Sequence, residues 1–163
     1  MSRPGHSPDR PKPDVLPLQV DLAFMTANVA QVFLTDEDWL GTLTAAHSAL
    51  RPGGRLIFES RDPERRAWEN WTPESTREVI RTSHNGEVET WVEITHLDGA
   101  LVTLDSPTIF HNDGARIDST STLRFRSRDE LTASLEHAGF TVEDVRDAPD
   151  RPGRELVFVA RKN

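Results

Sequence analysis

The chain has 163 residues, a length typical of one domain, and carries a formal net charge of −8 from 27 acidic and 19 basic residues. An acidic surface repels phosphate backbones, and no apolar run approaches the roughly 18 residues of a membrane span, so we expect neither nucleic acid nor membrane as a partner. The absence of cysteine excludes disulfides and thiolate sites. With no apolar leader at the start, we expect a cytoplasmic protein.

Residues 1–19 are predicted to form a disordered, proline-rich tail. Five of the 11 prolines fall within the first 17 residues, and no apolar residue recurs there at a regular spacing. Proline fixes φ and removes a backbone donor, so such a segment does not build a packed element. Ordered structure is expected over residues 20–163.

The first ordered elements are predicted to form a β-α-β unit. Residues 20–26 are a short apolar run typical of a buried strand. A helix should begin after Thr35, whose hydroxyl can cap the first turn, and end at Pro52-Gly53-Gly54. Residues 55–60 form the next strand, and this order of elements predicts a parallel pair with a right-handed crossover.

The middle of the chain changes to an antiparallel pattern, in which apolar and polar residues alternate. Three dipeptides are strong hairpin-turn signals: Asn85-Gly86, Asp98-Gly99 and Asp113-Gly114. We therefore predict a meander of about four strands over residues 77–126. A partly helical linker over residues 62–76 should join it to the β-α-β unit.

The last part of the chain returns to alternating helix and strand. Ser127 and Glu130 match the capping-box pattern, and Gly139 stands where a helix often ends. Strands are expected over residues 140–145 and 155–161.

Other polar residues have structural interpretations. Arg124, Arg126 and Arg128 form a small basic patch that we interpret as solvated side chains at a strand end. His47 falls on the apolar side of its helix and is interpreted as a boundary residue of the core. The six histidines show no metal-ligand spacing, so no metal site is expected.

Two phrases stand at either end of the predicted meander: LRPGGRLIFE at residues 50–59 and DELTASLEHAGFTVED at residues 129–144. Together with the strand before the first phrase and the strand after the second, they resemble the C-terminal half of class I S-adenosylmethionine-dependent methyltransferases. The resemblance implies an α/β fold with a partial Rossmann-like sheet of about four strands and two main helices. Residues 63–126 would be an inserted linker and antiparallel β-meander.

The resemblance also implies transfer of a methyl group from S-adenosylmethionine to a small-molecule acceptor. Ligands of open α/β sheets bind beyond the carboxyl ends of the strands. Five residues at the end of the first strand are therefore candidates for binding the cofactor: Met25, Thr26, Ala27, Asn28 and Gln31. For Asn28 the alternative is that it only forms the turn after the strand. No catalytic residue is carried over, because the cofactor supplies the electrophile.

Four further residues are candidates for binding the acceptor. Arg61, near Glu59, follows the second strand, with a solvated loop charge as the alternative. Trp68 and Trp71 would share a face on a helical turn, and packing against the sheet is their alternative role. His111 is the one histidine in a strand region that we expect to face the site, where it could act as a base.

The sequence also departs from the family. The family's N-terminal half carries a Gly-rich G-x-G loop and an acidic residue that bind the cofactor, and neither motif precedes residue 20. Without the strand that the family places beside residues 20–26, that strand becomes an exposed edge. We therefore expect a methyltransferase without its cofactor half, inactive alone, for which a truncated gene product, a mis-called start codon and a genuine half-protein are the open explanations. It should form a homo-oligomer or pair with a complementing chain through this edge. The alternative is a non-catalytic, methyltransferase-like binding or partner subunit.

Overall fold

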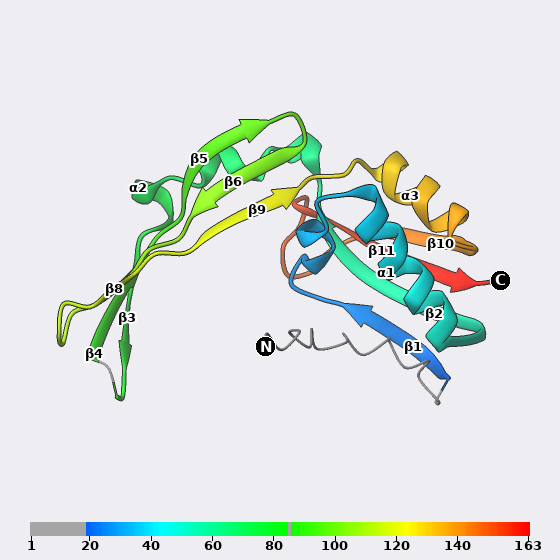
Figure 1. Cartoon of the computed structure of the whole chain (residues 1–163), viewed down its shortest axis with the longest axis horizontal. Coiled ribbons are helices and arrows are strands. Elements are labelled where there is room, and N and C mark those ends of the chain that lie inside the picture. Colours follow the sequence, from blue (N-terminus) through cyan, green and yellow to red (C-terminus); the bar gives the residue numbers. More distant parts are fainter. Residues whose placement is uncertain (1–18, 85) are drawn as a thin grey trace, which may run out of the picture.

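The computed structural model describes residues 19–84 and 86–163, so all of the predicted tail except Gln19 lies outside the described residues, as does Asn85 of the first hairpin signal. The described residues form an α/β body, built from the first and last elements, and an elongated arm of antiparallel strands that extends from it (Figure 1). None of the helices in this part of the chain has the length and apolar composition needed to cross a bilayer.

The described residues of the body form a four-stranded sheet. Its order is β1 (Val20–Met25), β2 (Leu50–Arg61), β11 (Glu155–Lys162) and β10 (Phe140–Asp147). β1 and β2 are parallel and are connected by helix α1 (Asp36–Ala49), whereas β11 is antiparallel to both of its neighbours. The predicted β-α-β unit and the mixed sheet of about four strands are confirmed.

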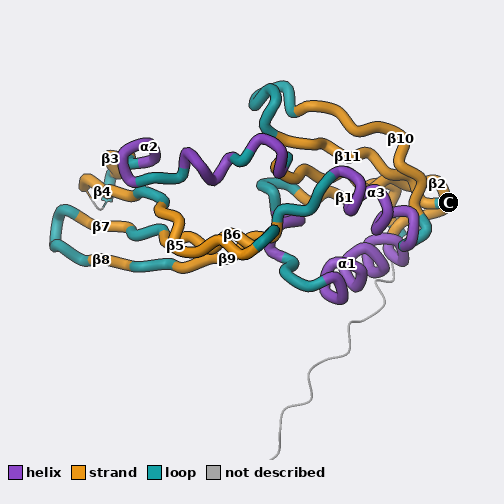
Figure 2. The backbone as a smooth tube through the Cα atoms, turned by 90° about the horizontal axis from the view of Figure 1, so that it is seen from above, coloured by secondary structure: helices purple, strands orange, loops and turns teal. Residues whose placement is uncertain are grey.

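Helices α1 and α3 (Arg128–His137) lie together on one face of this sheet (Figure 2). The core fills the space between them and the strands. Trp39 of α1 packs edge-on against Phe58 with ring centroids 5.4 Å apart, and Phe58 stacks on Phe158 at 5.0 Å. Burial of such large aromatic side chains supplies much of the stability of a small body.

The predicted starts of both helices are confirmed. The Thr35 hydroxyl accepts a hydrogen bond from the Asp38 amide at 3.1 Å. Ser127 and Glu130 form the reciprocal capping box, with distances of 2.7 and 3.2 Å. Each cap satisfies amide groups that the first helical turn leaves without a partner. Gly139 follows α3 with φ 89°, a left-handed conformation that favours glycine.

The end of α1 differs from the prediction. The helix ends at Ala49, before Pro52-Gly53-Gly54, and β2 already begins at Leu50. The Lys162 ammonium donates to the carbonyl oxygens of His47 at 2.7 Å and Leu50 at 2.8 Å. The last strand therefore satisfies carbonyl groups that the helix end leaves free. The helix thus ends before Pro52-Gly53-Gly54, at a place where Lys162, which is distant in sequence, contacts its last turn.

Gly54 leaves no room for a side chain within β2. A Cβ atom there would lie 2.9 Å from the carbonyl oxygen of Arg51 and 3.1 Å from that of Asp21. We expect Gly54→Ala to lower the free energy of unfolding by about 1–3 kcal/mol. Gly41→Ala, on the exposed side of α1 with no atom within 4 Å, should raise it by about 0.5–1 kcal/mol. Urea unfolding measures both changes, and effects of the same sign would contradict this account.

His47 gives the body a dependence on pH. Its ring is partly buried edge-on against Phe140, with centroids 5.2 Å apart. Burial lowers the pKa of His47 below its ordinary 6.5, and the charge of Lys162 lowers it further. Just below pH 6.5 the folded chain therefore binds fewer protons than the unfolded chain. The free energy of unfolding is therefore highest above pH 6.5, and it decreases as the pH falls from there through the pKa of His47 in the folded chain.

We expect His47→Gln to flatten this part of the stability profile, measured by urea unfolding between about pH 5 and 7.5. Three glutamates with lowered pKa values, Glu87, Glu89 and Glu143, have an ordinary pKa of 4.5 and titrate below this window. An unchanged slope in the variant would contradict the role of His47.

The described part of the arm contains seven short strands in two sheets, where the sequence predicted about four. They are β3 (Glu78–Thr82), β4 (Gly86–Thr90), β5 (Glu93–Asp98), β6 (Leu101–Asp105), β7 (Thr108–Phe110), β8 (Arg116–Ile117) and β9 (Thr120–Arg124). β4 continues into β5, β6 into β7 and β8 into β9, each after two residues outside a strand. The arm therefore consists of four antiparallel segments: β3, β4–β5, β6–β7 and β8–β9. Each of the last three contributes one strand to each sheet, and the predicted antiparallel meander is confirmed.

The two sheets of the arm lie one after the other. Sheet β5-β6-β9 lies nearer the body and sheet β3-β4-β7-β8 forms the far end (Figure 1). Pro107, which has no amide donor, falls in the interruption between β6 and β7. The linker to the body is partly helical, as predicted, with short helices η2 (Pro63–Arg65), η3 (Ala67–Asn70) and α2 (Pro73–Thr76).

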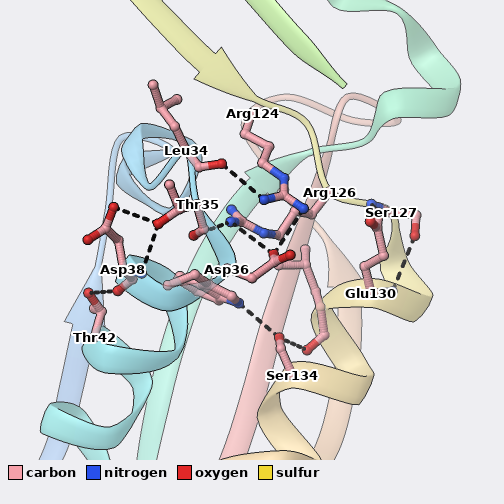
Figure 3. A network of polar contacts seen from close by, with 12 residues as sticks. Leu34, Thr35, Asp36, Asp38, Thr42, Arg124, Arg126, Ser127, Glu130 and Ser134 are labelled. Atoms are coloured by element: carbon pink, nitrogen blue, oxygen red, sulfur yellow. Dashed lines mark hydrogen bonds and ion pairs between the residues drawn. The ribbon is translucent and has the colours of Figure 1, made fainter. Parts of the chain in front are cut away.

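Arg124 and Arg126 join the arm to the body (Figure 3). Arg124 pairs with the Asp36 carboxylate at 2.9 Å, and Arg126 donates to the Thr35 carbonyl oxygen at 3.0 Å. The interpretation of this patch as solvated is wrong for Arg126, which is only 2% exposed, whereas Arg128 is exposed. The path from β9 to α3 brings Arg126 against the N-terminal end of α1, a contact that the local sequence does not reveal.

β1 is an edge strand of the described sheet, as expected, but the interpretation of residues 20–26 as a buried strand is wrong, because most of the side chains of β1 are exposed. Ala23 and Met25 pack against the core, so the alternate side chains point to the opposite face. There Leu22 is 42% and Phe24 61% exposed. An edge with unpaired backbone groups and exposed apolar side chains is a template for pairing with further polypeptide.

Candidate functional site

The candidate site lies where β1 and β2 end and β11 begins. β1 and β2 are parallel, so their carboxyl ends reach the same edge of the sheet. β11 is antiparallel to β2, and Glu155 at its start pairs with Arg61 at the end of β2. The topology thus brings polar residues from three strands to the edge at which ligands of open α/β sheets bind.

A network of buried polar groups holds these strand ends together. The Asn28 backbone amide donates to Glu59 at 3.2 Å, and its side-chain amide donates to Glu155 at 2.8 Å. Arg151, from the loop before β11, donates to Glu155 at 2.9 Å and to Glu59 at 3.2 Å. Asn28 is 3% and Glu155 5% exposed. Arg151 and Asn28 therefore donate hydrogen bonds to two carboxylates, of which Glu155 is buried and Glu59 is partly buried.

The backbone after β1 adopts an uncommon conformation. Ala27 and Asn28 both have φ 56°, a left-handed conformation that costs a non-glycine residue about 1–2 kcal/mol. Asparagine tolerates it better than most residues, and Asn28 does form the turn after the strand. This turn directs the Asn28 amide toward Glu59 and leads into the short helix η1 (Val29–Val32), which contains Gln31.

Three buried polar atoms of this network lack a hydrogen-bond partner among the described residues. They are Asn28 Oδ1, Gln31 Nε2 and Glu155 Oε2. The other end of the Gln31 amide, Oε1, accepts from Arg61 at 2.8 Å. Unpaired buried polar groups are costly and uncommon in folded proteins. These two acceptors and one donor are consequently points at which a polar ligand would gain hydrogen bonds.

A cavity of about 580 Å³ opens beside the network. Arg61, Arg151 and Arg154 line it from the body, and residues of the linker, including Trp71, line it from the other side. The Arg61 guanidinium lies over the Trp71 indole, 5.1 Å from the ring centroid. The volume falls in the range of small-molecule sites, about 300–1,000 Å³.

The residues predicted to bind the cofactor all lie at or just after the end of β1. Asn28 and Gln31 belong to the buried network described above. Met25 packs against the core, and the Thr26 carbonyl oxygen accepts from the Val29 amide at 3.2 Å. Ala27 contributes the first left-handed residue of the turn. The structure thus gathers this set around one turn but buries Asn28 and Gln31 almost completely.

Of the four residues predicted to bind the acceptor, Arg61, Trp68 and Trp71 lie near one another and His111 lies apart. Arg61 and Trp71 line the same cavity. Trp68 and Trp71 both pack against Phe125, with ring centroids 4.6 and 6.1 Å away, and both line a second pocket beside the linker. His111 does not line the cavity: it follows β7 in the far sheet of the arm, where its ring lies 3.0 Å from a Glu89 carboxylate oxygen.

Sequence analysis did not predict the residues of the linker that line the cavity beside Trp71, such as Arg65, nor three residues near the start of the last strand: Arg151, Arg154 and Glu155. These three belong to the loop before the last strand and to its first position. Their position follows from the strand order: a last strand that runs antiparallel to β2 begins at the edge of the sheet where the parallel strands β1 and β2 end. That inference requires the strand order, which the residue pattern alone does not provide.

No protein-family model and no curated protein matches this sequence. Solved structures do match its fold. An S-adenosylmethionine-dependent methyltransferase from Clostridium acetobutylicum superimposes with a TM-score of 0.69 at 15% identity. The amino pentose methyltransferase CalS10 from Micromonospora echinaspora gives 0.67 at 17%, and the sugar N-methyltransferase KedS8 from Streptoalloteichus sp. gives 0.66 at 14%.

Each of these comparisons covers 91% of this chain but only 58–60% of the neighbour. The chain therefore spans about three fifths of the length of these methyltransferases. At such identities the similarity shows a shared fold.

Proposed function

We propose that this chain is a methyltransferase domain that uses S-adenosylmethionine and acts on a small-molecule acceptor. One observation carries the proposal: in a fold shared with methyltransferases, the edge where β1 and β2 end holds a polar network beside a cavity of about 580 Å³. Ligands of open α/β sheets bind at this edge. CalS10 and KedS8 act on an amino pentose and a sugar, which supports a small polar acceptor.

The residues after β1 fit the amino-acid end of the cofactor in their chemistry. The unpartnered oxygens of Asn28 and Glu155 are acceptors that suit an ammonium group, and the unpartnered Gln31 amide nitrogen is a donor that suits a carboxylate. In this proposal three further residues complete the cofactor site at the turn: Met25, Thr26 and Ala27.

The chain's own task in methyl transfer is positioning. When bound, S-adenosylmethionine supplies an electrophilic methyl group. The residues must then hold the acceptor in line with that group and exclude water. Arg61, held by Gln31 and lying over Trp71, is placed to orient an acceptor in the cavity. An acceptor that reacts as a neutral amine needs no base for the attack itself.

We further propose that β1 pairs with additional polypeptide in the active state. Among the described residues β1 is an edge strand with exposed Leu22 and Phe24, and the methyltransferases of the same fold are longer than this chain. A second copy or a complementing chain could add strands there. Sedimentation should show self-association of the purified chain, and a monomer that persists from high to low concentration would favour the complementing chain.

Calorimetric titration with S-adenosylhomocysteine tests the function. The full chain, shown to be folded by circular dichroism, should bind the ligand saturably at 1:1, and the ligand should raise the melting temperature by mass action. Asn28→Gly, which suits the left-handed backbone but removes the side chain, should weaken binding by about tenfold. Asn112→Gly, in an exposed turn of the arm, is the matched control. No binding by a folded chain would mean that this chain alone does not hold the cofactor, so that methyl transfer requires a complementing chain or the chain is the alternative, a non-catalytic partner subunit.

A further inference from the structure

The cavity beside the strand ends carries an excess of positive charge. Arg61, Arg65, Arg151 and Arg154 line it, and Glu155 is the one acidic residue among the described residues of its lining. The whole chain has a net charge of −8, so this local excess opposes the composition. A concave site lined by one sign of charge attracts ligands of the opposite sign.

The four arginines differ in how far their charges are already compensated. Arg151 is paired with three carboxylates, and Arg65 lies 3.9 Å from Asp62. Across residues 19–84 and 86–163, no carboxylate forms an ion pair with Arg61 or Arg154. These two guanidinium groups can therefore bind an anion without losing an existing ion pair.

Arg61 is held in place before any ligand arrives. It donates to the buried Gln31 at 2.8 Å and lies over Trp71. Burial lowers the pKa of the Arg61 guanidinium, and the charge of Arg151 adds to this effect, while Glu155 and Glu59 oppose it. A cation that is partly removed from water and forms no ion pair of its own is stabilised by an anion that binds to it. A preorganised group also loses less conformational entropy on binding.

The remaining lining suits an organic molecule rather than a bare ion. Trp71 and Ala67 offer apolar surface, and Ser75 and Asn70 offer hydrogen-bonding groups. The cavity volume, about 580 Å³, exceeds what a single small anion would fill. The ligand should therefore have an anionic end and a larger, partly apolar body.

We propose that the small molecule bound in this cavity carries a carboxylate or phosphate group, which Arg61 and Arg154 bind together. The planar fork of an arginine side chain matches two oxygens of either group. This inference rests on the proposed function, under which the bound molecule is the methyl acceptor.

Calorimetric titration of the full chain with inorganic phosphate, and separately with glutarate, tests the anion site. The neutral glutaramide is the ligand control, and constant ionic strength holds screening fixed. We expect saturable binding of at least one anion, weakened about tenfold in Arg154→Met and in Arg61→Met. Arg81→Met removes the same charge from an exposed position on the arm and should change nothing. The anion that binds more tightly distinguishes a phosphate from a carboxylate ligand.

Arg154→Met is the decisive variant, because its side chain makes no hydrogen bond or ion pair with the described residues and its loss should not disturb folding. Absence of saturable anion binding, or equal weakening in all three variants, would overturn the inference. Binding of S-adenosylhomocysteine without anion binding would overturn it too, yet leave the proposed function standing. Anion binding without S-adenosylhomocysteine binding would support the anion site and count against the proposed function.

Discussion

Trp39→Ala is expected to lower the free energy of unfolding by about 3–5 kcal/mol, a large part of the total stability of a domain. Trp39 is 1% exposed and lies between helix and sheet, with its ring centroid 5.4 Å from that of Phe58 and 5.9 Å from that of Phe33. Its indole nitrogen also donates to Ser134 of α3 at 2.9 Å. Truncation therefore opens a cavity and removes a link between the two helices. Urea unfolding followed by circular dichroism measures the loss.

Two further variants separate these contributions. Ser134→Ala removes the hydrogen bond but keeps the ring, and should cost about 1 kcal/mol. Trp91→Ala removes a tryptophan of the arm, which is partly exposed and contacts Arg77 and Arg116. It should cost clearly less than Trp39→Ala. Equal losses from the two tryptophan variants would contradict the view that Trp39 is the centre of the core.

Arg151→Met is expected to destabilise the chain by about 2–3 kcal/mol. The substitution leaves the carboxylates of Glu155 and Glu59 side by side without their shared cation. Breaking a buried ion pair costs about 3–5 kcal/mol because one charge remains buried and unpaired. The cost is smaller here because the Arg151 side chain itself is partly exposed. Urea unfolding at neutral pH gives the value.

A double substitution tests the physical reason. If the cost comes from an uncompensated charge, Arg151→Met combined with Glu155→Gln should recover a substantial part of it, whereas independent effects would add. Arg146→Met is the matched control, since Arg146 pairs at 3.0 Å with the exposed Asp144. This surface pair should contribute less than about 1 kcal/mol. Simple additivity in the double variant would contradict the compensation of Glu155 by Arg151.

Local signals in the sequence were sufficient for much of the fold. Ser127 and Glu130 lie three residues apart, so their capping box depends only on one helical turn. The Gly99 turn likewise lies between two adjacent strands, and its φ of 55° is the conformation that an Asp-Gly pair favours. Such features are decided by neighbouring residues, which is why the β-α-β unit, the hairpins and the last helix could be predicted.

The candidate site could be predicted only in part from local sequence, because some of its residues are brought there by the tertiary structure. The position of Arg61 at the end of a strand marked one wall of the cavity, and Trp71 followed within the linker. The position of His111 could not be predicted, because it depends on how the strands of the arm pair. That pairing places His111 in the sheet far from the body. Arg154 was missed because the loop that contains it reaches the site only through the antiparallel pairing of β11 with β2.

The local sequence thus predicted the helices and hairpins of the described residues and the order of strand and helix in the body. The tertiary structure alone decided the end of α1 against Lys162, the burial of Arg126 and the joining of Asn28 to Glu155. The reason is the range of the interactions. Caps and turns involve residues a few positions apart, whereas each of these contacts joins residues about 90 or more positions apart, which only the folded chain brings together.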